Sequence, residues 1–152
     1  MSNPIEFNSA TPRIALPLLF AGQAQKEFFV NEALSRIDGL LNTSIEGEAG
    51  APPAAASEGE AWLVNASPTG EWAGHGGELA LRQSGNWLFA LPSEGMVVFD
   101  KSSRQSIRFD GIWRKASAVA SPQSGTTVDT EARAAIAGLI AALVETGILP
   151  EE

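Results

Sequence analysis

The chain has 152 residues, of which 44% are hydrophobic, and a mean hydropathy of +0.01, values typical of one small soluble globular domain. Its net charge is -8 and its ten lysines and arginines are scattered. Nucleic-acid binding requires clustered cations, so we expect no nucleic-acid partner. Cysteine is absent, which excludes disulfides, thiolate metal sites and cysteine nucleophiles.

The N-terminal residues 1–10 are polar without a period, and we expect an extended arm that becomes ordered on a partner. Pro12 and Pro17 fix their own φ angles and push the residues before them toward extended geometry, which predicts an extended apolar lead-in over residues 11–20. Residues 14–22 look like the apolar part of a secretory signal peptide. Because Pro17 interrupts them and they are too short to span a bilayer, we expect neither a signal peptide nor membrane insertion.

An amphipathic helix is predicted to follow the lead-in. Gly22 is the predicted N-cap, Gln25 occupies the third helical position, and the helix ends in the polar run 42–44. Apolar residues three and four apart form one stripe: Val30, Ala33, Leu34, Ile37, Leu40 and Leu41.

A recognisable signature runs through this region. The strings TPRIALPLL, AGQAQKE and NEAL, followed by Ile37-Asp38, resemble the N-terminal signature of an uncharacterised family carried by phages, prophages and gene transfer agents. Its members look like virion fibre or spike proteins, and in gene transfer agents the resemblance points to the head spike. The tryptophan-rich middle and alanine-rich end are also similar. Many members continue into a long C-terminal receptor-binding region, which has no counterpart in this sequence.

The resemblance implies a structural component of a phage-like particle, made in the bacterial cytoplasm and located in the virion or gene transfer agent particle. Residues 1–44 would attach it to capsid or other virion proteins, and the protein would contribute to adsorption to host cells. The candidate attachment residues are those of the signature: Pro12, Arg13, Leu16, Pro17, Leu18, Phe20, Gln23, Gln25, Lys26, Glu27 and Asn31.

The middle of the chain changes to short alternating runs. Residues 45–59 are rich in Gly, Pro, Ala and Ser and indicate a linker. The module 60–116 then contains runs at 61–65, 78–83, 87–91, 96–100, 106–110 and 112–115, bounded by turn residues. Their spacing predicts a small antiparallel β meander, with tight turns at 84–86 and 110–111.

The C-terminal region is predicted to be helical. A second linker covers residues 117–127, and a helix over 128–149 is capped by Thr127 or Asp129 and terminated by Gly147. The helix is rich in alanine, and its apolar stripe comprises Val128, Ala132, Ile136, Leu139, Ile140, Leu143 and Val144. The fold class is therefore α+β. Since the β module is too thin to bury its own faces, we expect a homo-oligomer, with a trimer as first choice and a pentamer as second.

Catalytic signals are weak. His75 is the only histidine, and no metal-ligand spacing surrounds it. The glycines around it are not followed by a helix, so they indicate a turn and not a phosphate loop. The remaining acids of this region scatter over turns and strand edges: Glu58, Glu60, Glu71, Glu78 and Glu94. We expect no enzyme, no metal and no cofactor.

The tryptophans raise a second hypothesis. Trp62, Trp87 and Trp113 lie in the motifs GEAWLV, GNWLFA and DGIWRKA, where we expect them to build the core. Trp72 lies in a glycine-flanked loop and, with His75, is the candidate contact to a glycan or another subunit. The alternative that Trp72 packs on its own sheet stays open. A carbohydrate-binding module for host cell-surface polysaccharide is therefore the alternative function, and a glycan-degrading enzyme the third.

Overall fold

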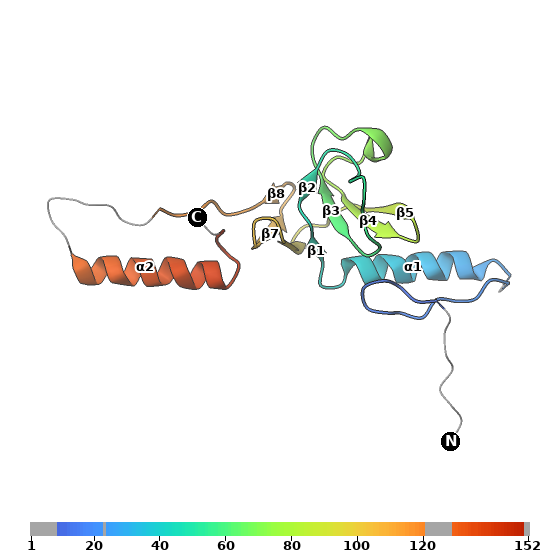
Figure 1. Cartoon of the computed structure of the whole chain (residues 1–152), viewed down its shortest axis with the longest axis horizontal. Helices are drawn as coiled ribbons and strands as arrows, with labels where there is room; N and C mark the ends of the chain where they lie inside the picture. Colours follow the sequence, from blue (N-terminus) through green and yellow to red (C-terminus); the bar gives the residue numbers. More distant parts are fainter. Residues whose placement is uncertain (1–8, 23, 121–128, 151–152) are drawn as a thin grey trace, which may run out of the picture. The chain divides into compact units, whose positions relative to one another are not determined.

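The computed structural model of the protein describes residues 9–22, 24–120 and 129–150, and within them it confirms the α+β fold class (Figure 1). Two helices and two four-stranded sheets are distributed over two compact units. The first unit comprises residues 1–43 and 48–92, and the second comprises residues 44–47 and 93–152. No helix in the described residues is long and apolar enough to cross a membrane.

The sheet of the first unit has the strand order β2-β3-β4-β5. Its strands are β2 (Glu48–Ala49), β3 (Ala61–Val64), β4 (Leu79–Gln83) and β5 (Asn86–Ala90). β2 pairs with β3 in parallel, whereas the other pairs are antiparallel. On one face, Val64 and Ala80 pack with Trp72 from the 3-10 helix η1 (Gly70–Trp72). The opposite face carries Leu81, which packs against helix α1 (Lys26–Leu40) at Gly39.

The start of α1 differs from the prediction. Gly22 is not the N-cap, because the helix begins at Lys26 and Gln25 occupies the N-cap position. Gln25 has a left-handed backbone (φ 66°), and its side chain makes no capping hydrogen bond. The predicted end is confirmed: the helix stops at Leu40, and the Leu41 N–H donates to the Ile37 carbonyl.

In the structure the predicted apolar stripe of α1 is only partly covered: Leu34 and Leu40 are half-buried, and its other members are exposed. The buried residues of the helix are Glu27, Asp38 and Gly39, whereas Val30 is 41% exposed and Ile37 is 51% exposed. The reason is the close approach at Gly39, where an added Cβ would lie 2.3 Å from Leu81 Cδ1. The helix brings Gly39 against the sheet, while Val30 and Ile37 remain exposed.

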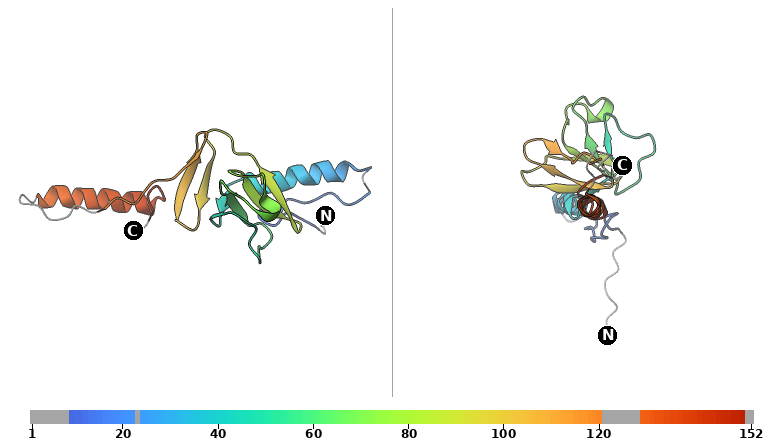
Figure 2. Two further views of the ribbon diagram at one scale, coloured as in Figure 1. Left: turned by 90° about the horizontal axis from the view of Figure 1, so that it is seen from above. Right: turned by 90° about the vertical axis from the view of Figure 1, so that its left-hand side faces the viewer.

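The lead-in is folded back and not extended as predicted. A bridge joins Ala10 to Pro17 in antiparallel fashion, and the Thr11 N–H donates to the Leu16 carbonyl at 2.9 Å. Ala15 allows the reversal with a left-handed backbone (φ 55°). The prolines set only their own φ angles and the conformations just before them, so they do not prevent a turn between them. The lead-in lies beside α1 in both views (Figures 1 and 2).

The second unit repeats the strand arrangement of the first. Its sheet has the order β1-β6-β7-β8, with β1 (Ser44–Ile45), β6 (Val97–Asp100), β7 (Gln105–Phe109) and β8 (Trp113–Arg114). β1 pairs in parallel with β6, and the remaining pairs are antiparallel. Each sheet is therefore a three-stranded meander with a two-residue strand added in parallel to its first strand.

The predicted strands of the module 60–116 are confirmed to within one residue at both their starts and their ends. They do not form a single meander, because they divide between the two sheets. The predicted linker 45–59 also contributes to both sheets through Ile45 of β1 and through β2. Two-residue strands are too short to display an alternating pattern, so periodicity does not reveal them.

Helix α2 (Thr130–Glu145) has the predicted punctuation. The Asp129 side chain caps it by accepting from the Ala132 N–H at 2.9 Å, and Gly147 ends it with a left-handed backbone (φ 68°). The alternative cap Thr127 and the stripe residue Val128 lie outside the described residues. No residue of α2 is buried. Most of the predicted linker 117–127 is also outside the described residues, and the predicted domain boundaries stay predictions.

Candidate attachment surface

The lead-in is fastened to α1 through one buried carboxylate. Asp38 is 0% exposed, and its oxygens accept hydrogen bonds from Thr11 Oγ1 (2.7 Å), the N–H groups of Arg13 (3.1 Å) and Ile14 (2.8 Å), and Gln83 Nε2 (3.2 Å). The donors come from the lead-in and from β4, so Asp38 joins three segments that are distant in sequence. A buried charge is tolerated only when hydrogen bonds replace its hydration, and here several do.

These hydrogen bonds determine the ionisation of Asp38. Burial by itself raises the pKa of the carboxyl, but the hydrogen bonds from Thr11, Ile14, Gln83 and Arg13 outweigh burial and hold the pKa below its ordinary value of 3.8. Asp38 is therefore charged at neutral pH, and it acts here as a structural acceptor.

Arg13 caps the end of α1 from outside the helix. Its guanidinium donates to the backbone carbonyls of Asp38 (2.9 Å), Gly39 (2.7 Å) and Asn42 (3.0 Å). The last carbonyls of a helix have no partner within it, and a cation near them is stabilised by the helix dipole. Arg13 was predicted as an attachment residue, but the structure uses its head group within the chain.

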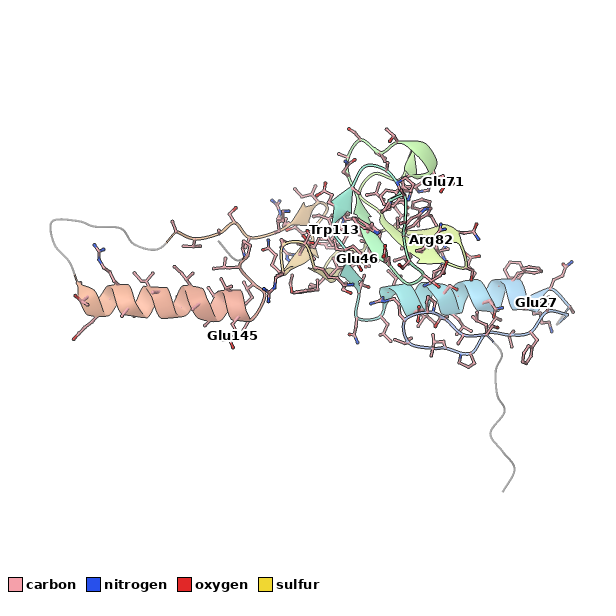
Figure 3. The ribbon with its side chains drawn as sticks, viewed as in Figure 1. Glu27, Glu46, Glu71, Arg82, Trp113 and Glu145 are labelled. Atoms are coloured by element: carbon pink, nitrogen blue, oxygen red, sulfur yellow. The ribbon has the colours of Figure 1, made fainter. Side chains whose placement is uncertain are left out.

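Two further signature residues hold the other end of the lead-in. The Asn31 side chain accepts from the Leu19 N–H (2.8 Å) and donates to the Leu19 carbonyl (3.1 Å). Glu27 is buried, and its Oε1 accepts from the Gly22 N–H at 3.1 Å; Figure 3 shows it near the start of α1. Arg13, Glu27 and Asn31 of the signature thus hold the lead-in beside α1.

Large apolar side chains of α1 and of the lead-in remain exposed to solvent. Phe28 is 70% exposed and Phe29 is 79% exposed, both in the first turns of α1. From the lead-in, Leu19 and Phe20 are 37% and 44% exposed. Exposed Phe and Leu side chains on a helix and on the segment beside it are candidates for an interaction surface. We name these four residues the lead-in surface.

The remaining signature residues have mixed positions. Leu16 and Leu18 are half-buried, whereas Pro12, Pro17, Gln25 and Lys26 are exposed. Gln23 lies outside the described residues. The exposed members are available to a partner, but the side chains with the largest exposed apolar area, Phe28 and Phe29, were not among the predicted residues.

Trp72 is not a surface residue, and its assignment as a glycan or subunit contact is wrong. Its side chain is 0% exposed, and its ring meets Trp87 edge-to-face, with ring centroids 5.0 Å apart. Trp72 of the glycine-rich loop therefore packs on its own sheet, which was the alternative interpretation. His75 is half-buried: its ring stacks on Phe89 with centroids 3.6 Å apart, and its Nδ1 lies 3.2 Å from Glu78 Oε2.

Sequence reasoning missed Asp38, although a signal was present. A carboxylate in the last turn of a helix is disfavoured by the helix dipole, so such an acid suggests a tertiary partner. For Phe28 and Phe29 the signal was their position outside the apolar stripe. Among the described residues, no group of three or more His, Asp or Glu side chains is arranged to hold a metal ion.

The fold class and this surface define a small α+β module. Residues 30–114, more than half of the chain, match the family described as "Protein of unknown function (DUF2793)", and the protein belongs to that family. The match includes Asp38 and both sheets, whereas the signature before Val30 precedes it. No curated protein matches the chain.

Proposed function

We propose that the protein is a structural component of a phage-like particle, a head spike or fibre base that attaches by its lead-in surface and contributes to adsorption to host cells. The observation that carries the proposal is the exposure of Phe28 and Phe29 on α1, beside a lead-in whose backbone N–H groups are held by Asp38 and Asn31. The resemblance of the signature to phage and gene transfer agent proteins supports it.

The partner in this proposal is another virion protein with an apolar groove. A preorganised apolar surface loses little conformational entropy when a partner covers it, which favours stable attachment. This surface also carries few charges. Along α1, the exposed ionisable residues closest in sequence to Phe28 and Phe29 are Lys26 and Glu32. An apolar partner surface complements it better than a charged one.

Deletion of the lead-in is a poor test, because it would also remove Thr11 and Arg13 from Asp38 and destabilise the unit. The sharper test is the double variant Phe28→Ser with Phe29→Ser. Particles from cells that express the double variant should contain much less of the protein than wild-type particles. The melting temperature of the purified double variant should stay close to that of the wild type.

A matched control is Ile112→Ser, which changes an exposed apolar residue (58% exposed) in the second unit. It should leave incorporation unchanged. Normal incorporation of the double variant would overturn the proposal.

A carbohydrate-binding module is the second candidate function. The observation that favours it is an open pocket beside Trp87 on the sheet of the first unit. This function is compatible with the first, because adsorption to a cell surface requires contact with surface polymers.

A further inference from the structure

The first unit contains a second surface feature, on the sheet face opposite to α1. An open pocket of about 460 Å³ lies between the loop 53–56, η1 and the hairpin of β4 and β5. Trp87 and Phe89 form the aromatic floor of this pocket. The strand register explains their position: Trp87 pairs with Arg82 and Phe89 pairs with Ala80, so these side chains share the face that packs on Trp72. The pocket is thus bounded by the loop 53–56, by η1 and by the hairpin.

Ring contacts within the unit hold Trp87 and Phe89 in place. The buried Trp72 ring contacts Trp87 edge-to-face at 5.0 Å, with an interplanar angle of 89°. His75 stacks on Phe89 in a nearly parallel arrangement, with an interplanar angle of 4°. Because these partners restrict both rings, a ligand that contacts them does not have to order them first.

The polar side chains of the pocket balance one another in charge. Arg82 is the one cation and Glu71 the one acid among the described residues that line it, and Asn86 adds an amide. Figure 3 labels Glu71 on η1 and Arg82 on β4. The Arg82 guanidinium carbon lies 5.2 Å from the Trp87 ring centroid, which orients the group. Its Nε is buried and has no hydrogen-bond partner among the described residues.

This combination restricts the ligand chemistry. A polyanion is disfavoured because one cation faces one carboxylate in a protein of net charge -8. A purely apolar ligand would leave Arg82 and Glu71 desolvated without partners. A saccharide ring satisfies both requirements, since its C–H groups contact an aromatic face while its hydroxyls accept from a guanidinium and donate to a carboxylate.

We infer that this pocket binds a neutral saccharide, with Arg82 and Glu71 contacting neighbouring hydroxyls and Trp87 contacting the ring. The inference deepens the adsorption part of the proposed function and rests on it for its biological setting. It also moves the predicted glycan contact from Trp72 to the half-buried Trp87, whose ring the buried Trp72 contacts edge-to-face.

The test is a glycan array carrying neutral, amino and acidic oligosaccharides, probed with the purified full-length protein. Binding to neutral members is the expected result, followed by titration of the best neutral oligosaccharide with tryptophan fluorescence. Arg82→Met and Glu71→Gln should each weaken that binding at least tenfold. Arg82→Met keeps the aliphatic stem, and Glu71 is exposed, so both variants should fold.

Matched controls are Lys101→Gln and Glu48→Gln, which remove an exposed cation and an exposed acid that do not line the pocket. They should bind as wild type does. Failure of the wild-type protein to bind any neutral saccharide overturns the inference. So does preference for acidic saccharides, or binding that survives both pocket substitutions.

The same variants separate this inference from the proposed function. Particles made with Arg82→Met should contain the normal amount of protein but adsorb less to cells. If particles incorporate the protein normally and no sugar binds, the saccharide site is wrong and attachment stands. If the protein is absent from wild-type particles but binds the neutral saccharide, attachment is wrong and the site stands.

Discussion

The two helices of the protein are held in place by opposite means. α1 has no side-chain cap at its start, yet Asp38 near its end accepts hydrogen bonds from residues distant in sequence. α2 has the Asp129 cap and the Gly147 terminator, but none of its residues is buried. Tertiary polar contacts determine where α1 lies, whereas local signals are sufficient to delimit α2.

The difference teaches how to interpret apolar residues on each helix. On α1 the burial of Asp38 and the close approach at Gly39 select the face that packs, so Phe28 and Phe29 are left in solvent. On α2 no residue is buried, so burial selects no face. An apolar stripe therefore does not by itself identify the buried side of a helix, since one buried charge can outweigh it.

The largest effect should come from Asp38→Ala, which removes the acceptor shared by the lead-in and β4. Thr11, Ile14 and Gln83 would lose their partner in a buried site, at a cost of about 3 to 5 kcal/mol. Chemical denaturation followed by circular dichroism measures this loss. Glu32→Ala is the control, because its exposed ion pair with Arg36 contributes only about 0.3 to 0.5 kcal/mol. Equal stability of the two variants would contradict the role of Asp38.

The glycines of the two helices offer a matched pair of substitutions. An alanine Cβ at Gly39 would meet Leu81 Cδ1 at 2.3 Å, so Gly39→Ala should destabilise the protein by about 1 to 3 kcal/mol. At Gly138 nothing lies within 4 Å of the added Cβ, and Gly138→Ala should favour α2 by about 0.5 to 1 kcal/mol. Denaturation for Gly39→Ala and amide exchange in α2 for Gly138→Ala measure the two effects. Effects of the same sign would remove the distinction between the helices.

Acid should weaken α1 through Asp38. The pKa of Asp38 is lower in the folded state than its ordinary value of 3.8, so its stabilising contribution is present above that pH and is lost as the pH falls toward the folded pKa. Stability measured across this acid range should fall less steeply in Asp38→Asn than in wild type. Asp100 and Asp110 of the second unit also have lowered pKa values, held by Ser103 and Ser102 and by Arg114 respectively. Their protonation should account for the dependence of stability on pH that remains in Asp38→Asn. If Asp38→Asn and wild type show the same dependence, the stabilising role of the Asp38 carboxylate is contradicted.

The smallest effect should come from Asp129→Ala, which removes the cap of α2. Loss of the hydrogen bond to the Ala132 N–H should cost the helix about 1 kcal/mol. Because α2 buries no residue, the loss should appear as faster amide exchange in its first turns and not as lower stability of the first unit. A fall in the global melting temperature comparable to that of Asp38→Ala would show that α2 is held by more than its local signals.

Strand positions and the ends of α2 were determined by sequence alone, because alternation and turn or cap chemistry act between residues close in the chain. The hairpin turn at Ser84-Gly85 is an example: both residues have positive φ (51° and 76°), as a tight hairpin requires. Three features were decided only by the tertiary structure: the hydrogen bonds that meet at Asp38, the division of the strands into two sheets, and the burial of Trp72 against its own sheet. Each joins residues far apart in sequence, and no local pattern encodes which distant partner satisfies a buried group.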